Sequence, residues 1–197
     1  AAFSSRGPTD DNRMKPDVSA PGTYILSTRS RDTAATGWGE FDTDYVYMGG
    51  TSMATPLTAG AAALILEHLN TNEGIASPSS ALVRAMFVAG AVDMDGQYGD
   101  PSNGAGESAP NFHEGWGRVD VGAAVNSSHA DGDTVVTAET REYIFNVPAG
   151  MSELRVVLAY TDPASSPGVG PHLVNDLDME LIHPDTTVQT LSNDLDP

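Results

Sequence analysis

The sequence predicts an α/β unit followed by a smaller antiparallel β unit, and three observations support this prediction. Residues 45–69 read as a short strand, a glycine turn and a long apolar helix, which is an arrangement of α/β sheets. Apolar residues recur with the period of a helix between residues 81 and 89. After residue 133 the apolar period falls from about 3.6 residues to about 2, as expected where strands replace helices.

The chain before the glycine turn is expected to contain loops and two short strands. Prolines and glycines punctuate residues 1–22, which favours loops and short extended pieces. Residues 24–27 and 45–48 are rich in aromatic and aliphatic side chains and predict strands. The polar residues 28–44 between them predict a surface loop.

The stretch of greatest chemical interest is GGTSMATP at residues 49–56, which is followed by the apolar residues 57–69. Pro56 has no N–H for the carbonyl of Ser52, so Ser52 is expected at or just outside the helix start. A helix start offers free N–H groups and a positive dipole end. Ser52 could therefore be an attacking oxygen and, through its N–H, an oxyanion donor, or simply a capping serine without chemistry. Because residues 57–69 are apolar almost all round, we expect this helix to be buried.

The next segments predict two more helices and two polar connections. Ser77 is the expected N-cap of a helix that ends at Gly90. The acidic, glycine-rich residues 93–114 are expected to form a solvated loop; the alternative, a Ca²⁺ loop, does not match the EF-hand spacing. A short helix capped by Asp120 is predicted at residues 121–125, and residues 127–133 read as a linker.

Residues 134–197 are predicted to begin an antiparallel β-sandwich or jelly-roll-like domain. Apolar and polar residues alternate at 142–147, 154–161 and 176–181, and His183-Pro184-Asp185 predicts a turn toward residues 188–191. A complete sandwich needs about seven or eight strands, so we expect the chain to stop midway through this domain.

Three acidic residues of the β unit are candidate metal ligands. Asp176 and Asp178 would share one face of a strand, and Asp194 would lie on the neighbouring strand if residues 183–185 form a hairpin. Hard oxygen ligands suit Ca²⁺, so structural calcium is the candidate cofactor. The alternative is a polar face on an acidic protein.

The charge of the chain excludes several classes of partner. The 197 residues carry 27 acidic and 9 basic side chains, a net charge of −18, with no basic stripe for nucleic acid and no attraction to an anionic membrane. No apolar run reaches the roughly 18 residues of a spanning helix. Lys15 is the single lysine, which is typical of high-salt organisms; the alternative is an ordinary acidic secreted protein. Without cysteine there is no disulfide and no thiolate chemistry.

The motif GTSMATP at residues 50–56 resembles the nucleophile motif of the subtilisin-like serine proteases (subtilases, peptidase S8 family). The segments FSSRGP at 3–8, KPDVSAPG at 15–22 and GWGRVD at 115–120 resemble other segments of that family. The resemblance implies that residues 1–126 are the C-terminal part of a parallel-sheet catalytic domain. It also implies that Ser52 is the nucleophile and an oxyanion donor, that the substrates are proteins or peptides, and that the protein is extracellular. LVNDLD at 173–178 resembles the β-sandwich domain of one subtilase branch, here residues 134–197.

The remaining parts of a protease site are not found in this sequence. In subtilases the triad Asp and His, the oxyanion Asn and the substrate pocket precede the serine, and neither triad motif occurs before Ser52. His68 would lie about 24 Å away along the helix, too far to accept the proton of Ser52. We therefore expect a serine endopeptidase acting by acyl transfer through Ser52, with this chain inactive and short of packing partners by itself. The alternative is a non-catalytic, Ca²⁺-dependent binding module on a subtilase-derived scaffold.

Overall fold

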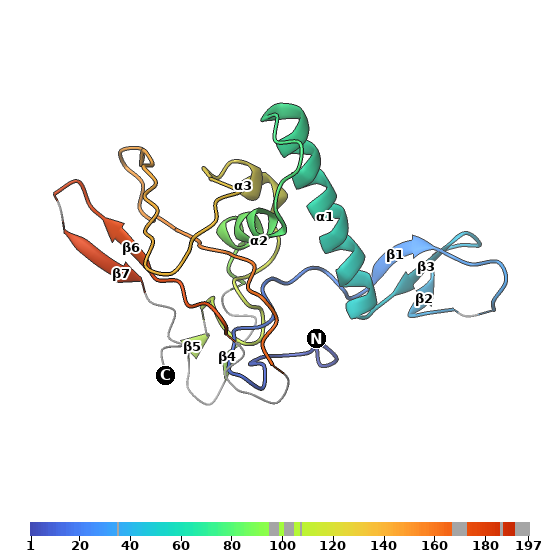
Figure 1. Ribbon diagram of the computed structural model, residues 1–197. Coiled ribbons are helices and arrows are strands. Elements are labelled where there is room, and N and C mark those ends of the chain that lie inside the picture. The colour runs from blue at the N-terminus through green and yellow to red at the C-terminus, as the bar shows by residue number, and fades with distance from the viewer. Residues whose placement is uncertain are drawn as a thin grey trace.

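The computed structural model describes residues 1–34, 36–94, 99–100, 105–106, 108–166, 173–185 and 187–191. The helices of the described part are α1 (Thr51–Asn72), α2 (Ser80–Ala89) and α3 (Val121–Val125). Its strands are β1 (Ile25–Thr28), β2 (Gly39–Glu40), β3 (Tyr45–Met48), β4 (Gly99–Asp100), β5 (Ala105–Gly106), β6 (Met179–Ile182) and β7 (Val188–Leu191). Figure 1 shows α1 between the β1–β3 sheet on one side and the pair α2 and α3 on the other.

The first sheet delivers the chain to α1. Its order is β1-β3-β2, and all its pairings are antiparallel, with Ile25 opposite Met48 and Gly39 opposite Tyr47. The strands predicted at 24–27 and 45–48 are therefore confirmed to within one residue. The predicted parallel sheet is not seen in the described residues. Their parallel pairing is limited to an isolated bridge between Ser19 and Arg118.

Helix α1 is buried along one face, not all round. Ala61, Ile65 and Leu69, spaced four residues apart, are buried against α2 and α3 in a core that also contains Leu82, Met86, Phe87 and Ala124. Leu64 remains 55% exposed and Leu57 44% exposed, so the expectation of a fully buried helix is wrong for this structure. Apolar composition indicates that a helix can be buried, but the number of faces covered depends on how many elements pack against it.

The boundaries of α2 and α3 are fixed by side-chain caps. Ser79, not Ser77, is the N-cap of α2, and its Oγ accepts a hydrogen bond from Leu82 N–H at 2.9 Å. The N-cap predicted at Ser77 is thus wrong by two residues. Ser79 is also held by the carboxylate of Asp131, 52 residues away in the sequence, and the local sequence gives no sign of that contact. Asp120 caps α3 as predicted, accepting from Ala123 N–H at 3.0 Å.

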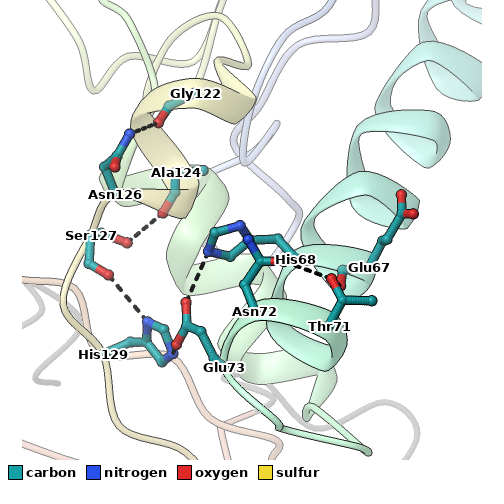
Figure 2. A network of polar contacts seen from close by, with 10 residues as sticks. All are labelled: Glu67, His68, Thr71, Asn72, Glu73, Gly122, Ala124, Asn126, Ser127 and His129. Atoms are coloured by element: carbon teal, nitrogen blue, oxygen red, sulfur yellow. Dashed lines mark hydrogen bonds and ion pairs between the residues drawn. The ribbon is translucent and has the colours of Figure 1, made fainter.

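The segment after α3, predicted to be a linker, is anchored to both long helices. His129 Nε2 lies 3.0 Å from Glu73 Oε2 at the end of α1, and His68 Nε2 lies 3.1 Å from the other oxygen of the same carboxylate (Figure 2). Asp131 accepts hydrogen bonds from the N–H and the hydroxyl of Ser79 at the start of α2. These contacts hold residues 127–131 against the first unit, although the division into domains at 1–126 and 134–197 stays a prediction.

The loop before α3 is not fully solvated. Glu114 has no exposed surface, and its carboxylate accepts hydrogen bonds from Asn111 Nδ2 at 2.8 Å and from Met94 N–H at 3.1 Å. The expectation of a solvated acidic loop is therefore wrong for Glu114, since two donors compensate the desolvation of its carboxylate. Much of the loop between residues 95 and 107 lies outside the described residues.

The second unit contains one strand pair among its described residues. Strands β6 and β7 form an antiparallel hairpin with Met179 opposite Leu191, and His183 N–H closes it on Thr187 O at 2.9 Å. This confirms the predicted turn. Residues 142–147 and 154–161 form no strand, so the β-sandwich is not confirmed. Alternating side chains define a face of a strand, but a strand also needs a partner to satisfy its backbone, and the pattern does not specify one.

Candidate active site

Ser52 is the second residue of α1, at the end of the helix that follows strand β3. Its side chain is exposed, and no side-chain hydrogen bond of Ser52 is found within the described part of the chain. The hydroxyls of Thr55 and Thr58 instead bond to the carbonyls of Thr51 and Ala54, at 2.9 and 3.1 Å. Of the hydroxyls in the first two turns of α1, those of Thr51 and Ser52 make no side-chain hydrogen bond among the described residues, so the Ser52 hydroxyl is available to an external molecule.

The turn before Ser52 requires glycine at its second position. Gly50 is the N-cap of α1 with φ 149° and ψ 167°, a region that residues with a Cβ rarely occupy. Its N–H donates to Gly22 O at 2.7 Å, which ties the turn to the segment before β1. The sequence motif therefore forms a turn with a defined backbone that presents Ser52 at the helix end.

The electrostatic environment at this end of α1 favours a negative charge. The first N–H groups of a helix have no intrahelical acceptor, and no side chain caps them here. The first turn contains no acidic residue, so the positive end of the helix dipole is not neutralised. The N–H of Ser52 is consequently free to donate to a negatively charged oxygen bound beside the Ser52 hydroxyl.

Within the described residues no histidine is hydrogen-bonded to the Ser52 side chain. His68 lies near the far end of α1, where its ring contacts Glu73, and His129 contacts the same carboxylate. His113 N–H donates to Asn111 Oδ1 at 2.9 Å, and His183 belongs to the β6–β7 turn. His172 lies outside the described residues. These placements agree with the inference from helix length that His68 cannot serve Ser52.

The candidate calcium ligands are not brought together by the described residues. Asp176 and Asp178 are exposed, and Asp194 lies outside the described residues. No group of three or more His, Cys, Asp or Glu side chains in the described ranges is arranged to hold a metal ion. Calcium binding therefore stays a prediction.

Sequence reasoning missed Asp162, which organises the LVNDLD segment. Its carboxylate accepts hydrogen bonds from Val174 N–H at 2.7 Å, from Asn175 N–H at 3.1 Å and from Asn175 Nδ2 at 2.7 Å. The Val174 N–H, helped by the two donors of Asn175, holds the pKa of Asp162 below its usual range. Burial raises the pKa of Tyr160, whose hydroxyl donates to Asn175 O at 2.8 Å, and the nearby Asp162 and Asp176 charges raise it further.

A second missed residue is Arg155, which joins the two units. Its Nη1 donates to the carbonyls of Ala91 at 2.7 Å, Ala89 at 3.3 Å and Val88 at 3.4 Å, at the C-terminal end of α2. A cation at this end of a helix is favourable for both hydrogen bonding and the dipole. A single arginine in an alternating segment gives no sign of such a long-range contact, so the sequence could not have predicted it.

An α/β chain with a serine presented at a helix start after a glycine turn is the arrangement of a serine hydrolase nucleophile. The sequence model of the subtilase family matches residues 1–117. This chain therefore belongs to the subtilase family.

Individual relatives agree with this assignment. The chain is 27% identical, over 98% of its length, to serine protease/ABC transporter B family protein tagD of Dictyostelium discoideum, of which it covers 14%. It is 49% identical, over 34% of its length, to serine protease AprX of Bacillus subtilis (strain 168), of which it covers 16%. It is 37% identical, over 64% of its length, to subtilisin-like protease SBT4.4 of Arabidopsis thaliana, again covering 16%. The chain thus spans about a seventh of the length of these relatives.

The described residues contain no helix that combines the length and the apolar character needed to cross a membrane.

Proposed function

We propose that this chain carries the nucleophile of a serine endopeptidase, with Ser52 as the attacking residue. The observation that carries the proposal is the exposed Ser52 hydroxyl at the N-terminus of α1, which has no hydrogen-bond partner among the described residues, within a family named for its proteases. The proposed substrates are proteins or peptides, and the reaction is hydrolysis of a peptide bond by acyl transfer.

The proposed reaction uses two properties of the helix start. Ser52 Oγ attacks the carbonyl carbon of the scissile bond, and its proton passes to a general base. The carbonyl oxygen becomes negative and accepts a hydrogen bond from the N–H of Ser52, in the field of the α1 dipole. The leaving amine takes up the proton, and water then hydrolyses the acyl ester on Ser52.

The general base, its orienting carboxylate and a second oxyanion donor are proposed to come from other parts of a longer protein. Support comes from the small share of each relative that this chain covers and from the position of His68 and His129, which both contact Glu73 at the opposite end of α1 from Ser52. The 197 residues by themselves are accordingly proposed to be inactive.

The test is a peptide hydrolysis assay of two proteins, the 197-residue chain and the full-length protein that contains it. We expect turnover in the full-length protein, loss of at least about a thousandfold with Ser52→Ala, and no Ser52-dependent turnover by the chain alone. Thr55→Ala, which removes a hydroxyl three residues away that bonds only the backbone, is the matched control and should leave turnover largely unchanged. Equal turnover in the native and Ser52→Ala proteins would contradict the proposal.

Calcium and location complete the proposal. We propose one structural Ca²⁺ in the second unit, supported by hard oxygen donors at Asp176 and Asp178 beside the ordered Asp162–Asn175 contact. A calcium-dependent rise in melting temperature that Asp178→Asn abolishes would support it, and an unchanged melting temperature with chelator would contradict it.

An extracellular location is proposed from the family membership and the net charge of −18, and fractionation of the culture medium tests it.

A further inference from the structure

The glycine turn is packed against an aromatic side chain that the proposed chemistry does not use. A Cβ added to Gly49 would lie 2.2 to 2.4 Å from Cη2, Cζ2 and Cζ3 of Trp38. The backbone of Gly49 is not left-handed, in contrast to that of Gly50. Glycine is therefore needed at position 49 for space, because the indole ring occupies the volume of a side chain.

Trp38 is held in place from three directions. The backbone N–H of Trp38 donates to Tyr47 O at 2.7 Å. This bond lies next to the pairing of β2 with β3. Its ring makes edge-to-face contacts with Tyr24, at a centroid distance of 5.2 Å, and with Phe3, at 5.9 Å. These partners come from separate segments of the chain, so the indole is fixed relative to the sheet and to the N-terminal loop together.

The other residue of the turn is tied to the same group of segments. Gly50 N–H donates to Gly22 O at 2.7 Å, and Tyr24, which packs on Trp38, follows two residues later. Trp38 and Gly22 thus contact Gly49 and Gly50, and Ser52 follows two residues later as the second residue of α1.

We propose that Trp38 is a positioning residue for Ser52: its indole packs against Gly49, fixes the glycine turn and so sets the position of the attacking oxygen. The inference rests on the proposed function of Ser52. Trp38 is 41% exposed, so its packing against the turn contributes little core burial. Rate is sensitive to such contacts because a misplacement of about 1 Å can cost about a hundredfold.

The experiment uses the full-length protein and a double-mutant cycle between positions 38 and 49. Trp38→Phe removes the distal ring that meets Gly49 but retains an aromatic ring for Tyr24 and Phe3. Gly49→Ala places a methyl group against the indole. We expect each single variant to lower kcat on a small peptide substrate by about tenfold, with KM changed less than about twofold. The double variant should be at least about fivefold faster than Gly49→Ala, because the smaller ring makes room for the methyl group.

A second readout separates positioning from substrate contact. The rate at which a fluorophosphonate probe labels Ser52 should fall in parallel with kcat, since this small probe makes few contacts away from the serine. Phe41→Ala is the matched control, because Phe41 is 58% exposed, follows β2 and packs its ring on Tyr47, and among the described residues no ring contact or hydrogen bond joins it to the turn. This variant should label at the native rate. Thermal melts confirm that each variant is folded.

The outcomes are distinct. Labelling of the native protein with unchanged labelling in Trp38→Phe would overturn the inference alone. A rise in KM with unchanged kcat, or a double variant no faster than Gly49→Ala, would also overturn it, because Trp38 would then contact substrate without positioning the turn. Absence of any labelling at Ser52 in the native protein would overturn the proposed function and this inference with it.

Discussion

Replacing Arg155 with methionine tests whether the second unit is docked on the first through the end of α2. Methionine retains an apolar side chain but removes the donors that bind the carbonyls of Val88, Ala89 and Ala91. A hydrogen bond from a charged group contributes about 1.5–3 kcal/mol, and a cation at a helix C-terminus about 0.3–1 kcal/mol. Because the side chain of Arg155 is 32% exposed and also pairs with Glu153, we take the lower part of this range, about 1–2 kcal/mol.

The assay is limited proteolysis of residues 142–161, which extend without strand pairing in the described structure. When opening is fast relative to cleavage, the cleavage rate follows the population of the open form. A loss of about 1–2 kcal/mol therefore raises the rate about five- to thirtyfold.

Arg141→Met provides the matched control. Arg141 pairs with Glu139 and donates to Thr134 O, and no hydrogen bond or ion pair joins it to α2 in the described part of the chain. We expect its cleavage rate to stay within about twofold of the native rate. Cleavage of Arg155→Met at the native rate, or an equal acceleration in both variants, would refute the docking role.

Three further predictions concern the first unit. Partial burial opposes ionisation of Asp131, but hydrogen bonds from Ser79 outweigh it and hold the pKa of Asp131 below its usual range. The ionised Asp131 therefore stabilises the fold near neutral pH, and this stabilisation is lost as the pH falls through the lowered pKa. Urea unfolding should show Asp131→Asn less stable than the native protein at pH 7 and nearly equal to it well below pH 3, and a constant difference would contradict this. Gly50→Ala should lower the free energy of unfolding by about 1–3 kcal/mol, because alanine must either adopt φ near 149° or distort the start of α1. An unchanged melting temperature would contradict the backbone conformation described for Gly50. Leu69→Ala should lower the free energy of unfolding of this chain by about 2–5 kcal/mol, because Leu69 has no exposed surface. Leu64→Ala should lower it by less than about 1 kcal/mol, because Leu64 is 55% exposed. Equal losses of stability would contradict the one-sided burial of α1.

The local features of the fold could be predicted because they depend on short-range chemistry. The glycine turn follows from the backbone freedom of Gly50. The position of Ser52 at the start of α1 follows from the missing N–H of Pro56. The start of α3 follows from the capping side chain of Asp120. The β6–β7 turn follows from the alternating pattern on either side of His183-Pro184-Asp185.

Features that depend on long-range packing were missed or wrong. The burial of α1 on one face and the pairing of the second unit depend on which elements are present to pack against them, which an apolar pattern does not specify. Glu114 reads as a surface residue because one of its two donors, the Met94 N–H, comes from 20 residues away in the sequence. Trp38 reads as part of a polar loop, since its contact with Gly49 depends on the pairing of β2 with β3.

The measurement that tests the central claim most directly is mass-spectrometric mapping of a fluorophosphonate adduct on the full-length protein. We expect a single phosphonylated residue, Ser52, and no adduct in Ser52→Ala. An adduct on another residue, or equal labelling of the native and Ser52→Ala proteins, would contradict the claim that the hydroxyl at the start of α1 is the nucleophile.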